Sequence, residues 1–319
     1  MNAPGSAGGV VLAVVQVALF IFLAPVLIGV IRQVRARIEG RAGAGIWQPW
    51  RDVRKLLAKN PVRAAGSSWM LRAGPVALVT SSLLLCVLLP LVGTLPFPFI
   101  PSDLFVIVSI MLIGVVALAL VGLDGGTAFG GMGSSRHMTV AALVEPTLLL
   151  SVYALSIPAG TSTISAIVKT RLVTPEVIIS PVSVLAIVAL CIAIMAETGR
   201  LPIDNPGTHL ELTMLHEAMT LEASGRDLAW LEVGSWLKLA ALLGLVSNLV
   251  MPWGVATEFS ALGLLIGVAS ITAKVLAFGI LLSVGEIFLA KIRLFQVPEL
   301  LAGSFALAFL AVTASYLVA

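Results

Sequence analysis

The stretch LFVIVSIMLIGVVALALVGL, residues 104–123, has no charged side chain. A helix needs about 20 mostly apolar residues to cross the hydrocarbon core of a bilayer. Similar stretches recur along the 319-residue chain, and together they predict eight spans. The spans are expected over residues 9–31, 72–92, 103–123, 139–159, 177–196, 235–254, 261–284 and 299–318. The sequence therefore predicts an all-α polytopic membrane protein, with residues 1–319 forming a single membrane domain.

Composition excludes the other broad classes of protein. Hydrophobic residues make up 59% of the chain and charged residues 11%, against about 25% charged in an average soluble domain. A soluble enzyme needs more polar surface, and a disordered chain has fewer apolar residues. The long apolar runs also lack the alternation of a transmembrane β-barrel. Since Cys86 and Cys191 both lie inside apolar runs, they build neither a disulfide framework nor a metal cluster.

The basic residues predict the orientation of the chain. Of 19 Lys and Arg residues, only Lys169 and Arg171 fall in loops on the side of the N-terminus, while Lys238 and Lys274 fall within spans. The other 15 lie in loops on the opposite side. Because cytoplasmic loops are enriched in Lys and Arg, both termini are expected outside. The first span is not a signal peptide, since no basic residue precedes it and its apolar core is too long.

Two long loops are expected on the inside. The first, residues 32–71, is basic and contains an amphipathic stretch, Ile46–Lys59, whose spacing predicts a helix on the membrane surface. The second, residues 197–234, carries seven of the 16 acidic residues. No internal repeat relates the two halves of the chain, although many free-standing secondary transporters are built from repeats.

The acidic loop contains a predicted helix over residues 208–223. Pro202 and Pro206 prevent a long helix before it, and Thr208 with Glu211 three residues later matches a capping box. One face of this helix is apolar and can pack beneath the bundle. The opposite face, with Glu211, His216 and Glu222, is available for a partner or a proton path.

Five ionisable residues lie in or at the ends of the predicted spans: Asp124, Glu145, Lys238, Lys274 and Glu286. Such groups are costly in the hydrocarbon and usually face a bundle interior or a water-filled path. All five are expected in the inner half or middle of the membrane and none near the outer end. This placement favours a half-channel that opens to the inside. For Asp124, Lys238 and Glu286, snorkelling near a helix end is the alternative.

No motif for catalysis or metal binding is recognisable. The glycines at residues 125–133 lie between two spans and lack the preceding strand of a nucleotide-binding loop. His216-Glu217 is not followed by the second histidine of a zinc site. We expect no catalytic residue, no bound metal and no redox centre in this chain.

The acidic loop resembles a known family. Glu197-Thr-x-Arg200-x-Pro-x-Asp204 is similar to the loop of subunit 1 of proton-pumping NADH:quinone oxidoreductases, the respiratory complex I family. The continuation, His209-Leu-Glu211-Leu-Thr-Met-Leu-His216-Glu217, is closer to the branch in energy-converting NiFe hydrogenases, which includes formate hydrogenlyase and hydrogenase-4.

Three further stretches agree with this resemblance. They are Arg32–Leu56 with its Gln-Pro-x-x-Asp-x-x-Lys pattern, Gly122–Pro146, and Lys291–Leu300. Two positions depart from the family pattern: His137 replaces an expected Glu, and Asn205 replaces a common Asp. Both departures reduce the negative charge of the loops.

The resemblance implies a subunit that anchors a soluble redox arm and links it to antiporter-like membrane subunits. The implied NiFe site and iron–sulfur clusters belong to soluble large, small and iron–sulfur partner subunits. Carried over by position, Asp124, Glu145, Glu197 and Asp204 form the proton path, to which burial alone adds Lys274 and Glu286. The implied partner interface consists of Arg35, Arg37, Arg136, Arg200, His209, Glu211, His216 and Glu217.

Three functions are compatible with these features. The first is a proton-coupling subunit of a hydrogenase or formate hydrogenlyase-type complex in a bacterial or archaeal cytoplasmic membrane. The second is the quinone-binding membrane subunit of a complex I-like NADH dehydrogenase, with a quinone between the first span, the amphipathic helix and the acidic loop. The third is an ion-transporter component. The basic charge is explained by membrane topology and anionic lipid, and nucleic acid is not an expected partner.

Overall fold

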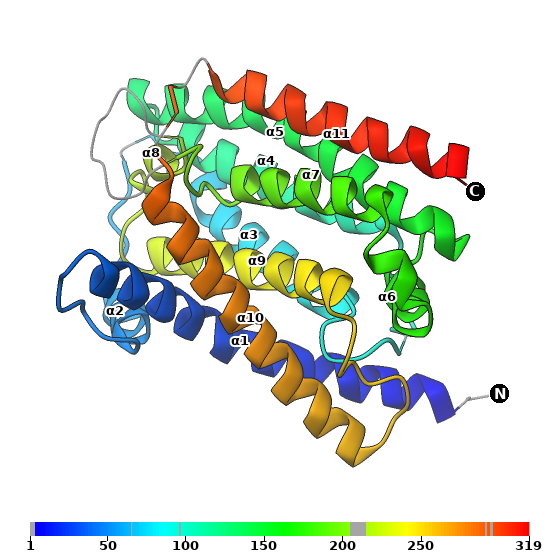
Figure 1. Cartoon of the computed structure of the whole chain (residues 1–319). Helices are drawn as coiled ribbons and strands as arrows, with labels where there is room; N and C mark the ends of the chain where they lie inside the picture. The colour runs from blue at the N-terminus through cyan, green and yellow to red at the C-terminus, as the bar shows by residue number, and fades with distance from the viewer. Residues whose placement is uncertain are drawn as a thin grey trace.

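The computed structural model describes residues 4–64, 66–95, 97–204, 215–290, 292–293 and 296–318, and no strand occurs within these ranges. Figure 1 shows a bundle of long helices. The α-helices are α1 (Pro4–Ile38), α2 (Gln48–Leu57), α3 (Met70–Leu88), α4 (Leu104–Asp124), α5 (Ala128–Ser156), α6 (Ile164–Val173), α7 (Pro181–Glu197), α8 (His216–Thr220), α9 (Gly225–Val250), α10 (Ala261–Phe288) and α11 (Val297–Val318). Two short 3₁₀ helices, η1 (Ile157–Ala159) and η2 (Pro175–Ile178), flank α6.

The predicted spans coincide with helices of the bundle. Seven described helices are long and apolar enough to cross a membrane, and the eighth predicted span corresponds to α7, which has 17 residues. That length is at the lower limit of about 17 residues for a transmembrane helix. The prediction of a polytopic all-α membrane protein is therefore confirmed.

Local sequence signals explain where several helices begin. Asp103 accepts a hydrogen bond from the backbone N–H of Phe105 at 2.9 Å, and Thr127 accepts one from Gly130 at 3.0 Å. Ser180 and Ser260 cap α7 and α10 in the same way, with Pro181 in the first turn of α7. These caps satisfy N–H groups that have no partner within their own helix.

The two ends of the bundle carry different elements. The chain termini, α6 and the α9–α10 connection lie at one end, here called the terminal end (Figure 1). The helices α2 and α8 lie at the opposite end, here called the α2/α8 end (Figure 1). The described parts of both predicted inside loops therefore lie at the α2/α8 end, as the predicted number of crossings requires. Which side of the membrane each end faces stays a prediction.

The helix α9 forms the centre of the bundle. In its most apolar window 83% of the residues are buried, compared with 22% for α10 and 28% for α11. It packs against α1, α3 and α10 among the long helices and against the amphipathic α2. The peripheral helices α10 and α11 therefore present most of their apolar side chains outward, as expected for surfaces that contact lipid or another membrane protein.

Buried polar side chains satisfy the backbone where α3 ends. Pro90 interrupts the helix and leaves carbonyl groups without helical partners. The amide of Gln16 donates to Leu89 O at 2.8 Å and accepts from Val92 N at 2.9 Å. Asn248 donates to the carbonyls of Pro90 and Leu91, both at 2.8 Å. Gln16 and Asn248 are uncharged, so the pattern of ionisable residues in the sequence did not single them out.

Arg171 is not the loop residue that the charge pattern suggested. Its side chain is 1% exposed and donates to Leu249 O and Ser183 Oγ, each at 2.7 Å. Burial lowers the pKa of this guanidinium to about 10. Arg171 therefore serves to satisfy a carbonyl in the last turn of α9, and the loops at the terminal end expose even less positive charge than expected.

The structure has a helix within residues 46–59, α2, which packs on α1 and α9. That this helix lies on the membrane surface stays a prediction. Val53 is buried, and the ring of Trp50 lies 5.7 Å from the ring of Phe22 on α1. The segment after α2 contacts the start of α9 through an ion pair between Arg63 and Asp227 at 2.8 Å. The basic and acidic loops are thus held together at one end of the bundle.

Gly29 permits close contact between α1 and Ile46, which lies two residues before α2. A Cβ atom at Gly29 would lie 1.9 Å from the backbone oxygen of Ile46. We expect Gly29→Ala to destabilise the protein by about 1–3 kcal/mol, because one backbone segment must move. Thermal unfolding in detergent measures the loss. Gly131→Ala is the control, since its Cβ meets nothing within 4 Å; equal unfolding temperatures for the two variants would contradict the explanation.

The helix predicted over residues 208–223 ends earlier along the chain than expected. Thr208 and the rest of residues 205–214 lie outside the described residues. Within the described part, α8 covers His216–Thr220 and ends three residues before the expected position. The backbone of residues 221–223 turns instead, with N–H of Ala223 bonded to O of Thr220 at 3.1 Å. Gly225, with a positive φ of 55°, then starts α9.

Candidate functional site

A buried ion pair links α7 to α9 near the α2/α8 end of the bundle. The ammonium of Lys238 donates to the carboxylate of Glu197, and their side chains are 8% and 1% exposed. Glu197 is the last residue of α7, and Lys238 lies in the central helix α9. A pair of opposite charges removed from water is held together strongly, because each charge left alone would be costly. Lys238 was predicted only as an ionisable residue of a span and was not assigned to the proton path.

A small polar cavity adjoins this ion pair. It measures about 20 Å³ and is lined by Glu197, Lys238, Ser235 and the two histidines His137 and His216, with apolar residues of α3 and α4 beside them. One water molecule needs about 10–15 Å³ of such volume and a few polar partners. The size and lining of the cavity therefore suit one water that contacts both members of the ion pair.

The two histidines meet at this cavity from different elements. The rings of His137 on α5 and His216 on α8 lie 5.6 Å apart and nearly perpendicular. His216 Nε2 lies 3.3 Å from Ser235 Oγ, whereas His137 Nε2 is buried without a hydrogen-bond partner among the described residues. Imidazole nitrogens can both accept and release protons. His137, which stands where the family pattern has Glu, thus contributes a proton-binding nitrogen in place of a carboxylate.

Glu145 lies further along α5 from His137, by about 12 Å of helix. One of its carboxylate oxygens, Oε1, is buried without a hydrogen-bond partner among the described residues. The carboxylate interacts electrostatically with both Glu197 and Lys238. Glu145 is therefore coupled to the ion pair by charge, as the prediction of a shared path requires.

Asp204 connects the end of α7 to the start of α8. Its side chain is buried and accepts hydrogen bonds from the backbone N–H of Leu215 at 3.1 Å and of His216 at 3.2 Å. It has additional interactions. Asp204 thereby fixes the position of His216 at the cavity.

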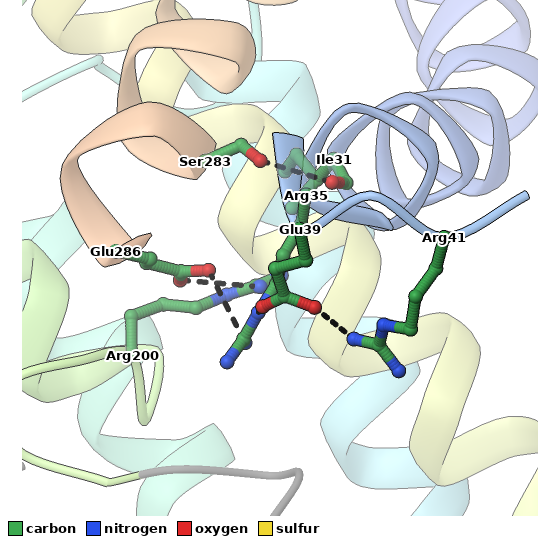
Figure 2. Close-up of polar contacts among 7 residues, drawn as sticks. All are labelled: Ile31, Arg35, Glu39, Arg41, Arg200, Ser283 and Glu286. Carbon is green, nitrogen blue, oxygen red and sulfur yellow. Dashed lines mark hydrogen bonds and ion pairs between the residues drawn. The ribbon is translucent and has the colours of Figure 1, made fainter. Parts of the chain in front are cut away.

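A second charged cluster lies where α1 and α10 end (Figure 2). The buried carboxylate of Glu286 is shared between Arg200, at 3.5 Å, and Arg35, at 3.9 Å. Arg35 also donates to Glu39 at 2.9 Å, and Glu39 pairs with Arg41. The cluster joins α1, α10 and the segment after α7. The backbone adds to this connection, because the N–H of Ile292 donates to Pro202 O at 3.0 Å.

Two predicted members of the proton path lie apart from these clusters. The carboxylate of Asp124 accepts hydrogen bonds from the N–H groups of Ser68 and Leu71, each at 3.0 Å, and so caps the start of α3. The ammonium of Lys274 donates to Asn248 Oδ1 at 3.0 Å and to Trp253 O at 2.6 Å. Since Trp253 belongs to the α9–α10 connection, the expectation that no ionisable group approaches the outer end is wrong for Lys274.

The predicted interface residues that are described lie at the α2/α8 end. Arg37 is exposed, while Arg35, Arg136 and Arg200 are partly exposed. His216 and Glu217 are partly buried on α8. His209 and Glu211 lie outside the described residues. In the described part of the chain, no group of three or more His, Cys, Asp and Glu residues is arranged to hold a metal ion.

The environment of His216 makes stability depend on pH. Burial lowers the pKa of this imidazole to about 4; the charges of Lys238 and Arg200 act in the same direction, and Asp204 opposes them. Because the unfolded chain binds a proton near pH 6.5, the stability that depends on neutral His216 is complete above that pH. It is lost as the pH falls toward 4.

We therefore expect wild type to lose roughly 3 kcal/mol relative to His216→Gln between pH 6.5 and 4. Unfolding of both proteins by denaturant at a series of pH values measures the difference. Parallel stability curves for the two proteins would contradict the assigned environment.

Together, the bundle and its polar end define a class of protein: a multi-pass membrane subunit with a buried acid–base cluster beneath a basic surface. The family model for NADH dehydrogenase matches residues 10–316, so the chain belongs to the NADH dehydrogenase subunit 1 family. This confirms the resemblance seen in the acidic loop.

Two relatives from Escherichia coli (strain K12) match the chain over nearly its whole length. Hydrogenase-4 component C is 36% identical over 304 residues, which cover 95% of this chain and 94% of the relative. Formate hydrogenlyase subunit 4 is 32% identical over 298 residues, which cover 93% of this chain and 95% of the relative.

A solved structure shows the same fold. A chain of the membrane-bound sulfane sulfur reductase, an archaeal respiratory membrane complex, superposes with a TM-score of 0.82 at 20% identity. The match covers 97% of this chain and 99% of that chain. This match shows the fold. Family membership and the two relatives together make the chain a multi-pass membrane subunit of a complex I-like assembly.

Proposed function

We propose that the chain is the membrane-anchoring and proton-coupling subunit of an energy-converting NiFe hydrogenase or formate hydrogenlyase-type complex. The observation that carries this proposal is the buried Glu197–Lys238 pair, which lies with a water-sized cavity at the α2/α8 end of the bundle. The similarity to hydrogenase-4 component C and formate hydrogenlyase subunit 4 along the whole chain supports the hydrogenase-type assembly. We place this complex in a bacterial or archaeal cytoplasmic membrane, as expected from the sequence.

In this proposal, protons move along the acid–base groups around the cavity. Glu145 and Glu197 take up and release protons, His137 and His216 extend the route, and Asp204 holds His216 in place. Protonation of Glu197 removes the charge that holds Lys238, which weakens the contact between α7 and α9. Asp124, Lys274 and Glu286 are further proposed members. Arg200 links Glu286 to the segment after α7, while Asp124 and Lys274 lie apart from the cavity.

The coupling works through the segment that joins the two charged clusters. Glu197 and Arg200 are three residues apart, and they bind Lys238 on α9 and Glu286 on α10. A partner that moves Arg200 therefore acts on both clusters. Such a shift changes the electrostatic environment of the proton-binding groups without any redox centre in this chain.

The proposed partners lie on both sides of this segment. Soluble large and small hydrogenase-like subunits and an iron–sulfur subunit, which carry the NiFe site and iron–sulfur clusters, dock at the α2/α8 end. The described contact residues are Arg35, Arg37, Arg136, Arg200, His216 and Glu217. Antiporter-like membrane subunits pack beside the outward-facing helices.

Purification of the tagged chain from its native membranes in mild detergent tests the assembly. We expect a subunit with nickel and iron, together with iron–sulfur protein, to co-purify in a fixed ratio. Co-purification with NADH-oxidising subunits instead would support the quinone-binding alternative. A chain that purifies alone and transports ions in liposomes would support the transporter alternative.

Arg200→Ala should weaken docking of the soluble arm. Arg200 is partly exposed and anchored by Glu286, so its loss removes a basic contact and loosens the segment after α7. We expect about tenfold less soluble subunit to remain bound at raised salt, since salt already weakens the other charge contacts. The measurement is the amount of soluble subunit per tagged chain after washing.

Lys169→Ala is the matched control for the loss of one basic side chain, because Lys169 is exposed on α6 at the terminal end. It should retain the soluble arm as wild type does. Equal retention in wild type and Arg200→Ala at every salt concentration would contradict the role given to Arg200.

A further inference from the structure

An apolar cavity of about 220 Å³ lies between α7, α9 and α10. Its walls include Ile194, Leu243 and Phe278, one from each helix, and Cys191 lies at its edge. Leu281 and Leu289, which also line it, are 65% and 43% exposed. The cavity therefore opens sideways to the surface of the bundle, where the hydrocarbon of the membrane lies.

One end of this cavity is charged. Its lining includes Thr198, Gly285 and Glu286, and Glu286 carries the carboxylate that Arg200 and Arg35 share, as Figure 2 shows. This charged end of the cavity is here called the mouth. Arg32 adds a further positive charge close enough to act on Arg200. Arg35 also pairs with Glu39, which pairs with Arg41 as well. The cluster therefore has four guanidinium groups for two carboxylates, an excess of positive charge at the mouth.

The shape and charge restrict what can occupy the cavity. A helix about 10 Å wide with a pitch of 5.4 Å fills roughly 400 Å³ per turn, which exceeds the cavity. A single hydrocarbon chain is narrow enough, and the walls exclude polar ligands. Basic groups between transmembrane helices at a membrane surface bind anionic lipid headgroups. A neutral headgroup would leave the excess positive charge without a partner.

We propose that this cavity binds one acyl chain of an anionic phospholipid, with the phosphate held by Arg200 and Arg35. The lipid then connects α7 and α10 beside the segment that carries Glu197 and Arg200. Arg200 and Arg35 are also proposed contacts of the soluble arm, so the lipid site is tested on the chain without that arm and separately from the proposed function.

The test uses the purified full chain, incorporated into nanodiscs of equal amounts of phosphatidylglycerol and phosphatidylcholine with identical acyl chains. After extraction in mild detergent, mass spectrometry counts the lipid retained per chain. We expect phosphatidylglycerol to be retained roughly 30-fold over phosphatidylcholine, since Arg200 and Arg35 each contribute about 1 kcal/mol, a factor of about five, toward an anionic lipid.

Two variants test the apolar cavity and its charged mouth separately. Gly285 lines the cavity and a Cβ there meets nothing within 4 Å, so Gly285→Leu should place its side chain in the cavity and abolish selective retention. Arg35→Gln should lower the selectivity about fivefold. Gly303→Leu is the matched control, because Gly303 on α11 also faces open space but lies outside the cavity lining; it should retain lipid as wild type does.

Thermal unfolding in detergent confirms that all three variants are folded. Equal retention of both lipids by wild type would overturn the proposal, as would undiminished phosphatidylglycerol retention by Gly285→Leu. Loss of retention in Gly303→Leu as well would also overturn it, because retention would then reflect lipid around the whole bundle.

Discussion

Lys238→Met is expected to destabilise the protein by roughly 3–5 kcal/mol, because it leaves the buried carboxylate of Glu197 without its cation. The Glu197 side chain is 1% exposed, so bulk water cannot solvate its charge, and the single water that the adjoining cavity suits does not replace a cation. Methionine keeps most of the volume of lysine, and the effect therefore reports the charge. Thermal or denaturant-induced unfolding in detergent, at pH 7.5 and constant salt, measures the change.

A second substitution separates charge from packing. In the double variant Lys238→Met with Glu197→Gln, no unpaired charge remains, and most of the stability should return. Lys274→Met is the matched control: Lys274 donates to an amide and a carbonyl oxygen, so its loss should cost only about 1–2 kcal/mol. An equal loss in both lysine variants, or no recovery in the double variant, would show that the pair does not carry this stability.

Glu145→Gln is expected to leave the complex assembled and to lower proton coupling on the order of a hundredfold, a typical effect of removing a positioned proton-transfer group. Glutamine matches the shape of glutamate but cannot exchange a proton. The carboxylate has a buried oxygen without a partner among the described residues and interacts with Glu197 and Lys238. Acidification measured with a pH-sensitive dye in vesicles, per hydrogen turned over, gives the coupling.

The control is Glu176→Gln, which removes a carboxylate that is exposed in η2. Its coupling should equal that of wild type. If an assembled Glu145→Gln complex moves as many protons per hydrogen as wild type, Glu145 has no place in the path.

Much of the fold follows from the distribution of charge along the chain. Each apolar run became a helix because a membrane leaves the backbone no partner outside its own segment. The helix ends were harder to predict: α1 continues to Ile38, and α5 and α9 begin at Ala128 and Gly225, about ten residues before the predicted spans. Hydropathy marks the part of a helix within hydrocarbon, while helices extend beyond it into charged and glycine-rich sequence.

Most acidic residues of the two buried charged clusters were singled out by the sequence, but their pairings were not. Glu145, Glu197, Asp204 and Glu286 stood out because charge is rare in this chain. Nothing in the spacing links Glu197 to Lys238, or Glu286 to Arg35 and Arg200, since these contacts join helices that are far apart in sequence. His137 was noted as a departure from the family pattern, and only the packing of α5 on α8 places it beside His216.

The most direct test of the proposed function is hydrogen turnover by the complex purified through this chain, measured with and without added quinone. If the chain couples a NiFe hydrogenase-type arm, the complex evolves or consumes hydrogen at the same rate without quinone, and quinone-site inhibitors have no effect. Absence of hydrogen turnover, together with an activity that requires quinone and is blocked by those inhibitors, would contradict it.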